Sequence, residues 1–177
     1  MEDKYKGKYR VQPARLKGWD YGSDGYYFVT ICTKNRIPYF GSIKTDLNGI
    51  ASLQKTHIAE IAYDNWLKIP EHHPFVELDE IVIMPDHIHV ILFINKPEKT
   101  TWEVNKAGSQ SKNLASIIRG YKSSIKQYAM VNDVDFAWQP RYYDRVIRDQ
   151  KEYLHIQAYI YDNPDKWERE GKNFENL

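Results

Sequence analysis

The sequence predicts an α+β protein with a ferredoxin-like βαββαβ core, a four-stranded antiparallel sheet and one additional C-terminal helix. Three observations lead to this prediction. Four short runs are rich in β-branched and aromatic residues, two amphipathic helical patterns lie between them, and a third helical pattern follows the last run. The order β-α-β-β-α-β folds most simply with both core helices on one face of the sheet, so the last helix is free to cover the other face.

The expected strands are residues 26–33, 75–84, 87–94 and 142–148, and the expected helices are residues 52–67, 114–128 and 150–163. Proline residues mark several of the boundaries. Pro70 ends the first helix and Pro164 closes the last one. Pro85 and Asp86 leave only a two-residue turn between the second and third strands, which is typical of an antiparallel hairpin. Residues 95–112 have no sustained apolar pattern and are expected to form a loop.

The composition indicates one cytoplasmic domain. A chain of 177 residues is long enough to bury its own core without disulfide bonds. The single cysteine, Cys32, excludes a disulfide scaffold and is typical of a small buried apolar residue. The N-terminus begins without an apolar signal segment, and no stretch approaches the roughly 18 apolar residues of a membrane span. We therefore expect a cytoplasmic location.

Net charge provides no overall argument for nucleic-acid binding, because it is only +1. Two local clusters are basic. An N-terminal arm of about residues 1–17 includes Arg10, Arg15 and Lys17, interleaved with tyrosines, and one face of the second helix carries Arg119, Lys122 and Lys126. Both clusters suit contacts with DNA phosphates. A solvated surface is the alternative for both clusters, so these six residues are candidates only.

A pair of histidines, His87 and His89, lies in an apolar run that predicts a central, buried strand. Alternate residues of a strand point to the same face, so the two imidazoles stand side by side. Buried imidazoles need hydrogen-bond partners or a metal ion. The pattern therefore leaves two interpretations open: a structural pair that is hydrogen-bonded within the core, or two ligands of a divalent metal.

The last helix carries side chains that can complete such a site. Tyr159 and Asn163 are four positions apart and share one helix face, with Glu152 and either His155 or Ile156 further along the same stripe. If this face meets the histidine pair, the Asn163 amide offers a third, oxygen ligand. Two nitrogens and one oxygen leave about half of an octahedral shell open, which suits Mg²⁺ or Mn²⁺ bound to a phosphate.

Tyr159 would then be a nucleophile, and a phosphotyrosine diester conserves the phosphodiester linkage for rejoining. A free phenol has a pKa of about 10 and needs help at neutral pH. Glu152 and His155 are candidate supporting groups, although no general base can be assigned. The chain has 14 tyrosines, so an ordinary packing role for Tyr159 remains an alternative.

At this point the chain resembles a known family, the single-tyrosine HUH (His-hydrophobic-His) transposases of the IS200/IS605 type, and within them the REP-associated tyrosine transposases. The resemblance extends over about residues 13–167. The residues that carry it are Ala-Arg-Leu-Lys-Gly-Trp-Asp-Tyr at 14–21, Trp66 with Ile69-Pro70, Val-Ile-Met-Pro-Asp-His-Ile-His-Val-Ile at 82–91, Trp138-Gln139, Tyr-Tyr-Asp-Arg-Val-Ile-Arg at 142–148 and Tyr-Ile-Tyr-Asp-Asn-Pro at 159–164.

The resemblance implies that residues 1–177 form one transposase domain with a basic N-terminal arm. It implies that His87, His89 and Asn163 bind a divalent metal, and that Tyr159 attacks single-stranded DNA beside a hairpin repeat to give a 5′-phosphotyrosine and a free 3′-hydroxyl. Insertion-sequence members of the family have Gln at the Asn163 position, so the amide oxygen is retained. The sequence leaves open whether the protein is a monomer or a homodimer.

Two other classes of function remain open. The protein could be a DNA-binding or repressor module that is derived from a transposase and performs no turnover. It could also be a structural or hydrolytic metalloprotein with His72 or His73 as extra ligands. Adjacent histidines rarely chelate one ion together, and these two precede Pro74 in an expected loop, so this alternative is the weaker one.

Overall fold

The computed structural model describes residue 16, residues 18–101, residue 103 and residues 111–170. Its elements are β1 Gly25–Cys32, the short 3₁₀ helix η1 Lys34–Arg36, β2 Gly41–Thr45, β3 Ala51–Lys55, α1 His57–Leu67, α2 Ile69–His72, β4 Val76–Met84, β5 His87–Ile94, α3 Leu114–Val131, β6 Tyr143–Ile147 and α4 Gln150–Glu170.

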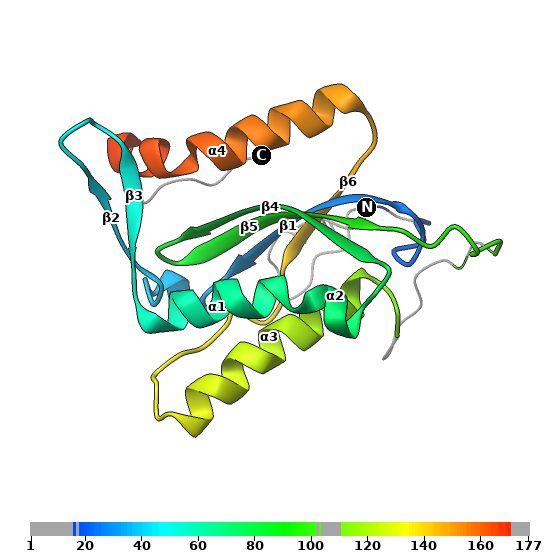
Figure 1. Ribbon diagram of the computed structural model, residues 1–177, viewed down its shortest axis with the longest axis horizontal. Coiled ribbons are helices and arrows are strands. Elements are labelled where there is room, and N and C mark those ends of the chain that lie inside the picture. The colour runs from blue at the N-terminus through cyan, green and yellow to red at the C-terminus, as the bar shows by residue number, and fades with distance from the viewer. Residues whose placement is uncertain (1–15, 17, 102, 104–110, 171–177) are drawn as a thin grey trace, which may run out of the picture.

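The main sheet has the strand order β4-β5-β1-β6, and each neighbouring pair is antiparallel. Helices α1, α2 and α3 lie on one face of this sheet, and α4 crosses the other face (Figure 1). The α+β class, the four-stranded antiparallel sheet and the separate C-terminal helix are thereby confirmed. The expected hairpin is also present, with Pro85 and Asp86 between β4 and β5.

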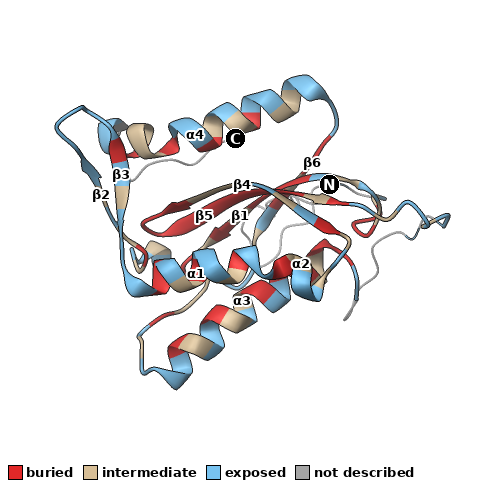
Figure 2. Cartoon of the chain, viewed as in Figure 1, coloured by how far each residue is buried: buried red, intermediate tan, exposed pale blue. Residues whose placement is uncertain are grey.

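The core is divided by the sheet into a large and a small cluster. The large cluster lies between the sheet and α1 and α3, where Trp66 and Tyr121 pack edge to face with ring centroids 5.7 Å apart. The small cluster lies under α4 and consists of Phe28, Ile91, Ile147, Ile156 and Ile160. Figure 2 shows the central strands and the inner faces of the helices as the buried parts of the chain. Burial on both faces explains why β5 is apolar at every position except His87 and His89.

Helix α3 begins at a complete capping box. The Asn113 side chain accepts a hydrogen bond from the backbone N–H of Ser116, and the Ser116 hydroxyl accepts one from the backbone N–H of Asn113. This cap, together with apolar residues spaced three and four apart, accounts for the predicted helix. The helix continues to Val131, three residues beyond the expected end at residue 128.

The predicted helix over residues 52–67 is wrong at its N-terminal end. Residues 51–55 form β3, which pairs with β2 in a separate two-stranded sheet, and α1 begins only at His57. The turn at Asp46–Gly49 explains the difference, because the Asp46 carboxylate accepts backbone N–H bonds from Asn48 and Ile50 and thereby closes a hairpin. We call this hairpin, residues 41–55, the β2–β3 arm.

The expected end of the last helix at Pro164 is also wrong, because α4 continues to Glu170. Tertiary contacts outweigh the missing N–H of the proline. Trp167 is buried against the His87 ring, and the β2–β3 arm contacts the same segment, with the backbone N–H of Ala51 bonded to Asp165 Oδ1. No helix in the described ranges combines the length and the apolar character needed to cross a membrane.

Candidate active site

His87 and His89 lie on the face of β5 that α4 covers. Their ring centroids are 4.5 Å apart, and only 2% and 4% of the two residues is exposed. The alternation of a strand therefore produces the predicted pair, and the next residue on this face, Ile91, belongs to the small core cluster. The two imidazoles form the buried side of the candidate site.

The orientation of His87 is set by its neighbour in the turn. Nδ1 of His87 lies 2.7 Å from Oδ1 of Asp86, which is itself 3% exposed. An ionised carboxylate only accepts hydrogen bonds, so Nδ1 carries the proton and donates it. In a neutral imidazole Nε2 then has a free lone pair. Metal-binding histidines in proteins are oriented in the same way, by a hydrogen bond from the other ring nitrogen to a carboxylate.

His89 is held at both ring nitrogens. Nδ1 lies 2.8 Å from Oγ1 of Thr30, the residue directly opposite on β1, and Nε2 lies 3.3 Å from Oη of Tyr159. The Tyr159 ring also packs edge to face on Phe28 and His89. The structure thus brings the predicted nucleophile next to the predicted ligands, within one chain.

Asn163 follows Tyr159 by one helical turn and is 1% exposed. Neither Oδ1 nor Nδ2 has a hydrogen-bond partner in the part of the chain that the structure describes. A buried amide without partners costs about 1–3 kcal/mol, so such a group calls for a ligand. An oxygen-preferring cation at Oδ1 would satisfy it, and the donor set fits Mg²⁺ or Mn²⁺.

No group of three or more His, Cys, Asp or Glu side chains in the described ranges has the arrangement of a metal site. The candidate centre therefore depends on an amide as its third ligand. His72 and His73, considered as extra ligands from the sequence, lie at α2, on the opposite face of the sheet from α4 (Figure 1). The weaker metalloprotein alternative loses its additional ligands.

Burial determines the protonation of the site. It lowers the pKa of His87, although the hydrogen bond to Asp86 opposes this, and it lowers the pKa of His89 well below 6.5. Burial also raises the pKa of the Tyr159 phenol, opposed by the Arg36 charge. At neutral pH the imidazoles are therefore neutral, as metal ligands must be, and the phenol keeps its proton.

The two candidate supporting groups on α4 are not beside the phenol. Glu152 accepts hydrogen bonds from Arg145 Nε at 2.6 Å and from the backbone N–H of Arg148 at 2.9 Å, two turns or about 10 Å before Tyr159. His155 is exposed, and Ile156 occupies the buried position of the stripe instead. The structure therefore gives Glu152 a role in anchoring the start of α4 and places His155 in solvent.

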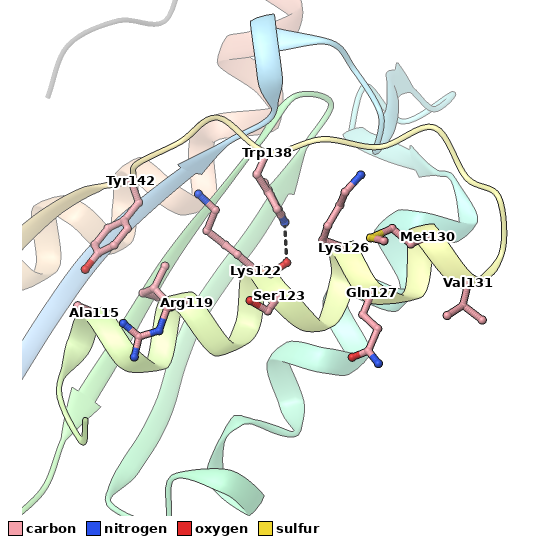
Figure 3. Close-up of a pocket in the computed structure, with 11 residues that line it drawn as sticks. Ala115, Arg119, Lys122, Ser123, Lys126, Gln127, Met130, Val131, Trp138 and Tyr142 are labelled. Carbon is pink, nitrogen blue, oxygen red and sulfur yellow. Dashed lines mark hydrogen bonds between the residues drawn. The ribbon is translucent and has the colours of Figure 1, made fainter. Parts of the chain in front are cut away.

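The basic stripe on α3 borders an open groove of about 680 Å³ that is lined mostly by apolar atoms of α3, Trp138 and Tyr142 (Figure 3). Lys122 Nζ donates to the carbonyls of Gln139 and Arg141, and Lys126 Nζ donates to that of Phe136. Both ammonium groups thus hold the segment before β6 against α3. A role of Arg119, Lys122 and Lys126 in DNA contact stays a prediction.

Arg10, Arg15 and Lys17 lie outside the described residues. Three residues of the site were not singled out from the sequence. Asp86 immediately precedes His87, so its position was a usable signal. Thr30 depends on the β1–β5 register, and Trp167 depends on a helix that continues past a proline, and no local sequence pattern indicates either.

The similarity to known proteins extends over nearly the whole chain. An uncharacterised protein of Haemophilus influenzae is 35% identical over 96% of this chain and 97% of its own length. A REP-associated tyrosine transposase of Escherichia coli is 30% identical over 56% of this chain and half of its own length. A second H. influenzae protein with the same family name is 28% identical over 83% of this chain and 74% of its own. The chain is thus similar to REP-associated tyrosine transposases of two species.

A solved structure agrees with this family at the level of the fold. The structure of a REP-associated tyrosine transposase bound to a REP hairpin superposes with a TM-score of 0.53 and 23% identity, and it covers 90% of this chain and 73% of the other. No protein-family model matches the chain. The resemblance expected from the sequence is therefore confirmed by REP-associated tyrosine transposases of two species.

Proposed function

We propose that this transposase-family protein cleaves and rejoins single-stranded DNA beside hairpin repeats through a covalent bond to Tyr159. The main support is one relationship: the Tyr159 hydroxyl lies 3.3 Å from Nε2 of His89, and the unpartnered amide of Asn163 lies one turn further along the same helix. A family relative that was solved with a REP hairpin supports the choice of DNA.

The chemistry is a transesterification. Oη of Tyr159 forms a bond to phosphorus while the bond between phosphorus and the 3′ oxygen of the preceding nucleotide breaks. The phenol loses its proton and the 3′ oxygen gains one, which leaves a 5′-phosphotyrosine and a free 3′-hydroxyl. Because the number of phosphodiester bonds is unchanged, a 3′-hydroxyl can attack the phosphotyrosine and rejoin the strand without ATP.

His87, His89 and Asn163 would hold Mg²⁺ or Mn²⁺. The ion would supply a Lewis acid that stabilises charge on the phosphoryl oxygens. The protein side chains do the rest: Asp86 and Thr30 orient the two imidazoles, and the small apolar cluster under α4 keeps water from the inner side of the phenol. Because the pKa of Tyr159 is raised, loss of its proton needs the positive charge that the ion would supply.

Contacts with the DNA would come from the basic arm, through Arg10, Arg15 and Lys17, and from Arg119, Lys122 and Lys126. These contacts would make binding weaken with salt in proportion to the number of phosphates neutralised. Since the phenol and the imidazoles meet within one chain, a monomer contains the nucleophile and all three candidate metal ligands.

The test is whether the protein forms a covalent adduct with DNA. The protein is incubated with hairpin oligonucleotides that carry single-stranded flanks, in Mn²⁺ or Mg²⁺, and adducts that resist denaturation are separated by electrophoresis. We expect an adduct with the wild type and none with Tyr159→Phe, which should still bind the DNA. Tyr161→Phe is the matched control, because this neighbouring tyrosine is 85% exposed.

If no adduct forms with varied hairpins and metals while the DNA is still bound, the protein is a DNA-binding module without turnover. An adduct of unchanged yield with Tyr159→Phe would contradict the assignment of the nucleophile.

A further inference from the structure

Arg36 is a cationic side chain at the candidate site that the mechanism above does not use. It lies at the end of η1, just after β1, where Cys32 pairs with His87 across the sheet. The segment that follows wraps the turn between β4 and β5: the backbone N–H of Thr33 bonds to the carbonyl of Asp86, and that of Phe40 bonds to the carbonyl of Pro85. Arg36 is therefore held beside the histidine pair.

The backbone at this point is unusual. Asn35 and Arg36 have φ angles of 55° and 56°, so two consecutive residues other than glycine are left-handed. Asn tolerates this region, but for Arg such a conformation costs about 1–3 kcal/mol and persists only where surrounding contacts enforce it. The Thr33 hydroxyl, bonded to the carbonyls of Ile37 and Asp86, is one such contact. Strained residues of this kind cluster at functional sites.

The Arg36 guanidinium is held in place by two contacts. Nε lies 3.2 Å from Asp86 Oδ2, and Nη1 donates to Cys32 Sγ at 2.9 Å. Asp86 thereby bridges Arg36 and His87, with one carboxylate oxygen for each. The Arg36 side chain remains 36% exposed. No acceptor for Nη2 is found among the described residues, and its two N–H donors lie on a planar fork that matches phosphate oxygens.

The position of Arg36 relative to His87 is set by Asp86. One Asp86 oxygen lies 3.2 Å from Arg36 Nε, and the other lies 2.7 Å from Nδ1 of His87. The side chain is thus a fixed, partly exposed cation beside the candidate ligand His87.

We propose that Arg36 is a catalytic residue that donates hydrogen bonds from Nη2 to the phosphate attacked by Tyr159. This inference rests on the proposed function. The contact would stabilise the charge that develops on the phosphoryl oxygens, while Asp86 holds the guanidinium in place. The alternative is that Arg36 only neutralises Asp86 and so supports His87 from behind.

The experiment uses the oligonucleotide that the wild-type protein cuts, at saturating Mn²⁺, with adduct formation measured in a single turnover. Removal of one such donor typically lowers the rate by about 10²-fold or more, which we expect for Arg36→Gln. Arg36→Lys should recover part of this loss, because it keeps the charge without the planar fork. Arg169→Gln, which removes a 75% exposed arginine on α4, should leave the rate unchanged.

Two readouts separate phosphate contact from a structural role. In the Tyr159→Phe background, Arg36→Gln should make the logarithmic salt dependence of DNA binding less steep by about 0.7, the value for one phosphate of a single strand. With a neutral methylphosphonate at the scissile position, the difference in rate between the wild type and Arg36→Gln should largely disappear. The same methylphosphonate comparison with Arg36→Lys replaces this test if Arg36→Gln does not fold.

A rate for Arg36→Gln that is restored when Mn²⁺ is raised above the concentration that saturates the wild type, or an unchanged salt dependence, would overturn the proposal and leave Arg36 as a support for Asp86. In both cases the wild type still forms its adduct. If the wild type forms no adduct with any hairpin DNA, the proposed function fails, and the assignment of Arg36 fails with it.

Discussion

Oη of Tyr159 and Nε2 of His89 lie 3.3 Å apart, although 70 positions separate the two residues in the chain. The contact is made inside one molecule, because α4 crosses the sheet over its own β5 (Figure 1). Two further features hold α4 in this position: Trp167 packs on His87, and the β2–β3 arm contacts the last turns of the helix. A complete candidate site therefore needs no second subunit.

This geometry predicts that two inactive variants cannot complement each other. A mixture of Tyr159→Phe, which lacks the nucleophile, and His87→Ala, which lacks a ligand, should form no covalent DNA adduct, because each molecule has only half of a site. The measurement is the adduct assay on the mixture, with the wild type at half concentration as the control. Adduct formation by the mixture would show that α4 is exchanged between subunits.

Asp86 should control metal affinity without being a ligand. Loss of a group that orients a metal-binding histidine typically reduces affinity by about 10–100-fold, so we expect such a loss of Mn²⁺ affinity for Asp86→Ala and at least as large a loss for His87→Ala. Titration with Mn²⁺ followed by electron paramagnetic resonance measures this directly. His57→Ala is the matched control, since the His57 side chain is 67% exposed. Equal Mn²⁺ affinity in wild type and His87→Ala would refute the metal site.

Stability should fall when the pH drops below about 6.5. The pKa values of His87 and His89 are lowered by burial in the folded state, whereas in the unfolded chain they return to about 6.5. Between the folded and the unfolded pKa the unfolded chain binds more protons, so the free energy of unfolding decreases as the pH falls. Each group contributes at most about 1.4 kcal/mol per pH unit in this window.

Urea denaturation at about pH 7.5 and pH 5.5 in the absence of metal measures this effect. A variant with His87→Gln and His89→Gln should show a shallower dependence. Some dependence should remain, because burial also lowers the pKa of His73. A double variant with the same pH dependence as the wild type would show that these imidazoles do not account for it.

Gly41 should be essential for the β2–β3 arm. Its φ angle is 130°, and a Cβ at this position would lie 2.0 Å from the backbone oxygen of Gln54. Gly41→Ala should therefore destabilise the protein by more than about 1 kcal/mol and loosen the end of α4. Hydrogen exchange over residues 163–168 and the melting temperature measure the two effects.

Gly120→Ala is the contrasting control in the middle of α3, because apart from the adjacent residues and the nearby backbone of the helix itself no described atom lies within 4 Å of the added Cβ. This change should stabilise the protein by up to about 1 kcal/mol. Unaltered exchange over residues 163–168 in Gly41→Ala would mean that the arm does not hold the helix.

The local sequence pattern was sufficient to predict most of the fold. The apolar runs of β4 and β5 and the two-residue turn between them predicted the hairpin, and the spacing of apolar residues predicted α3. It failed at residues 51–55 and beyond Pro164. In the first case a hairpin closed by Asp46 outweighs helical spacing, and in the second the packing of Trp167 outweighs the helix-ending tendency of proline.

The sequence by itself determined which chemical groups the protein has and which of them share a face: the His87 and His89 pair through the two-residue period of a strand, and Tyr159 and Asn163 through the helical turn. Only the tertiary structure decided that these two faces meet, that Asp86 and Thr30 orient the imidazoles, that Glu152 and His155 lie apart from the phenol, and that Arg36 lies beside the site. The physical reason is that periodicity relates near neighbours in the chain, whereas contacts across 70 positions depend on strand register and on how α4 packs on the sheet.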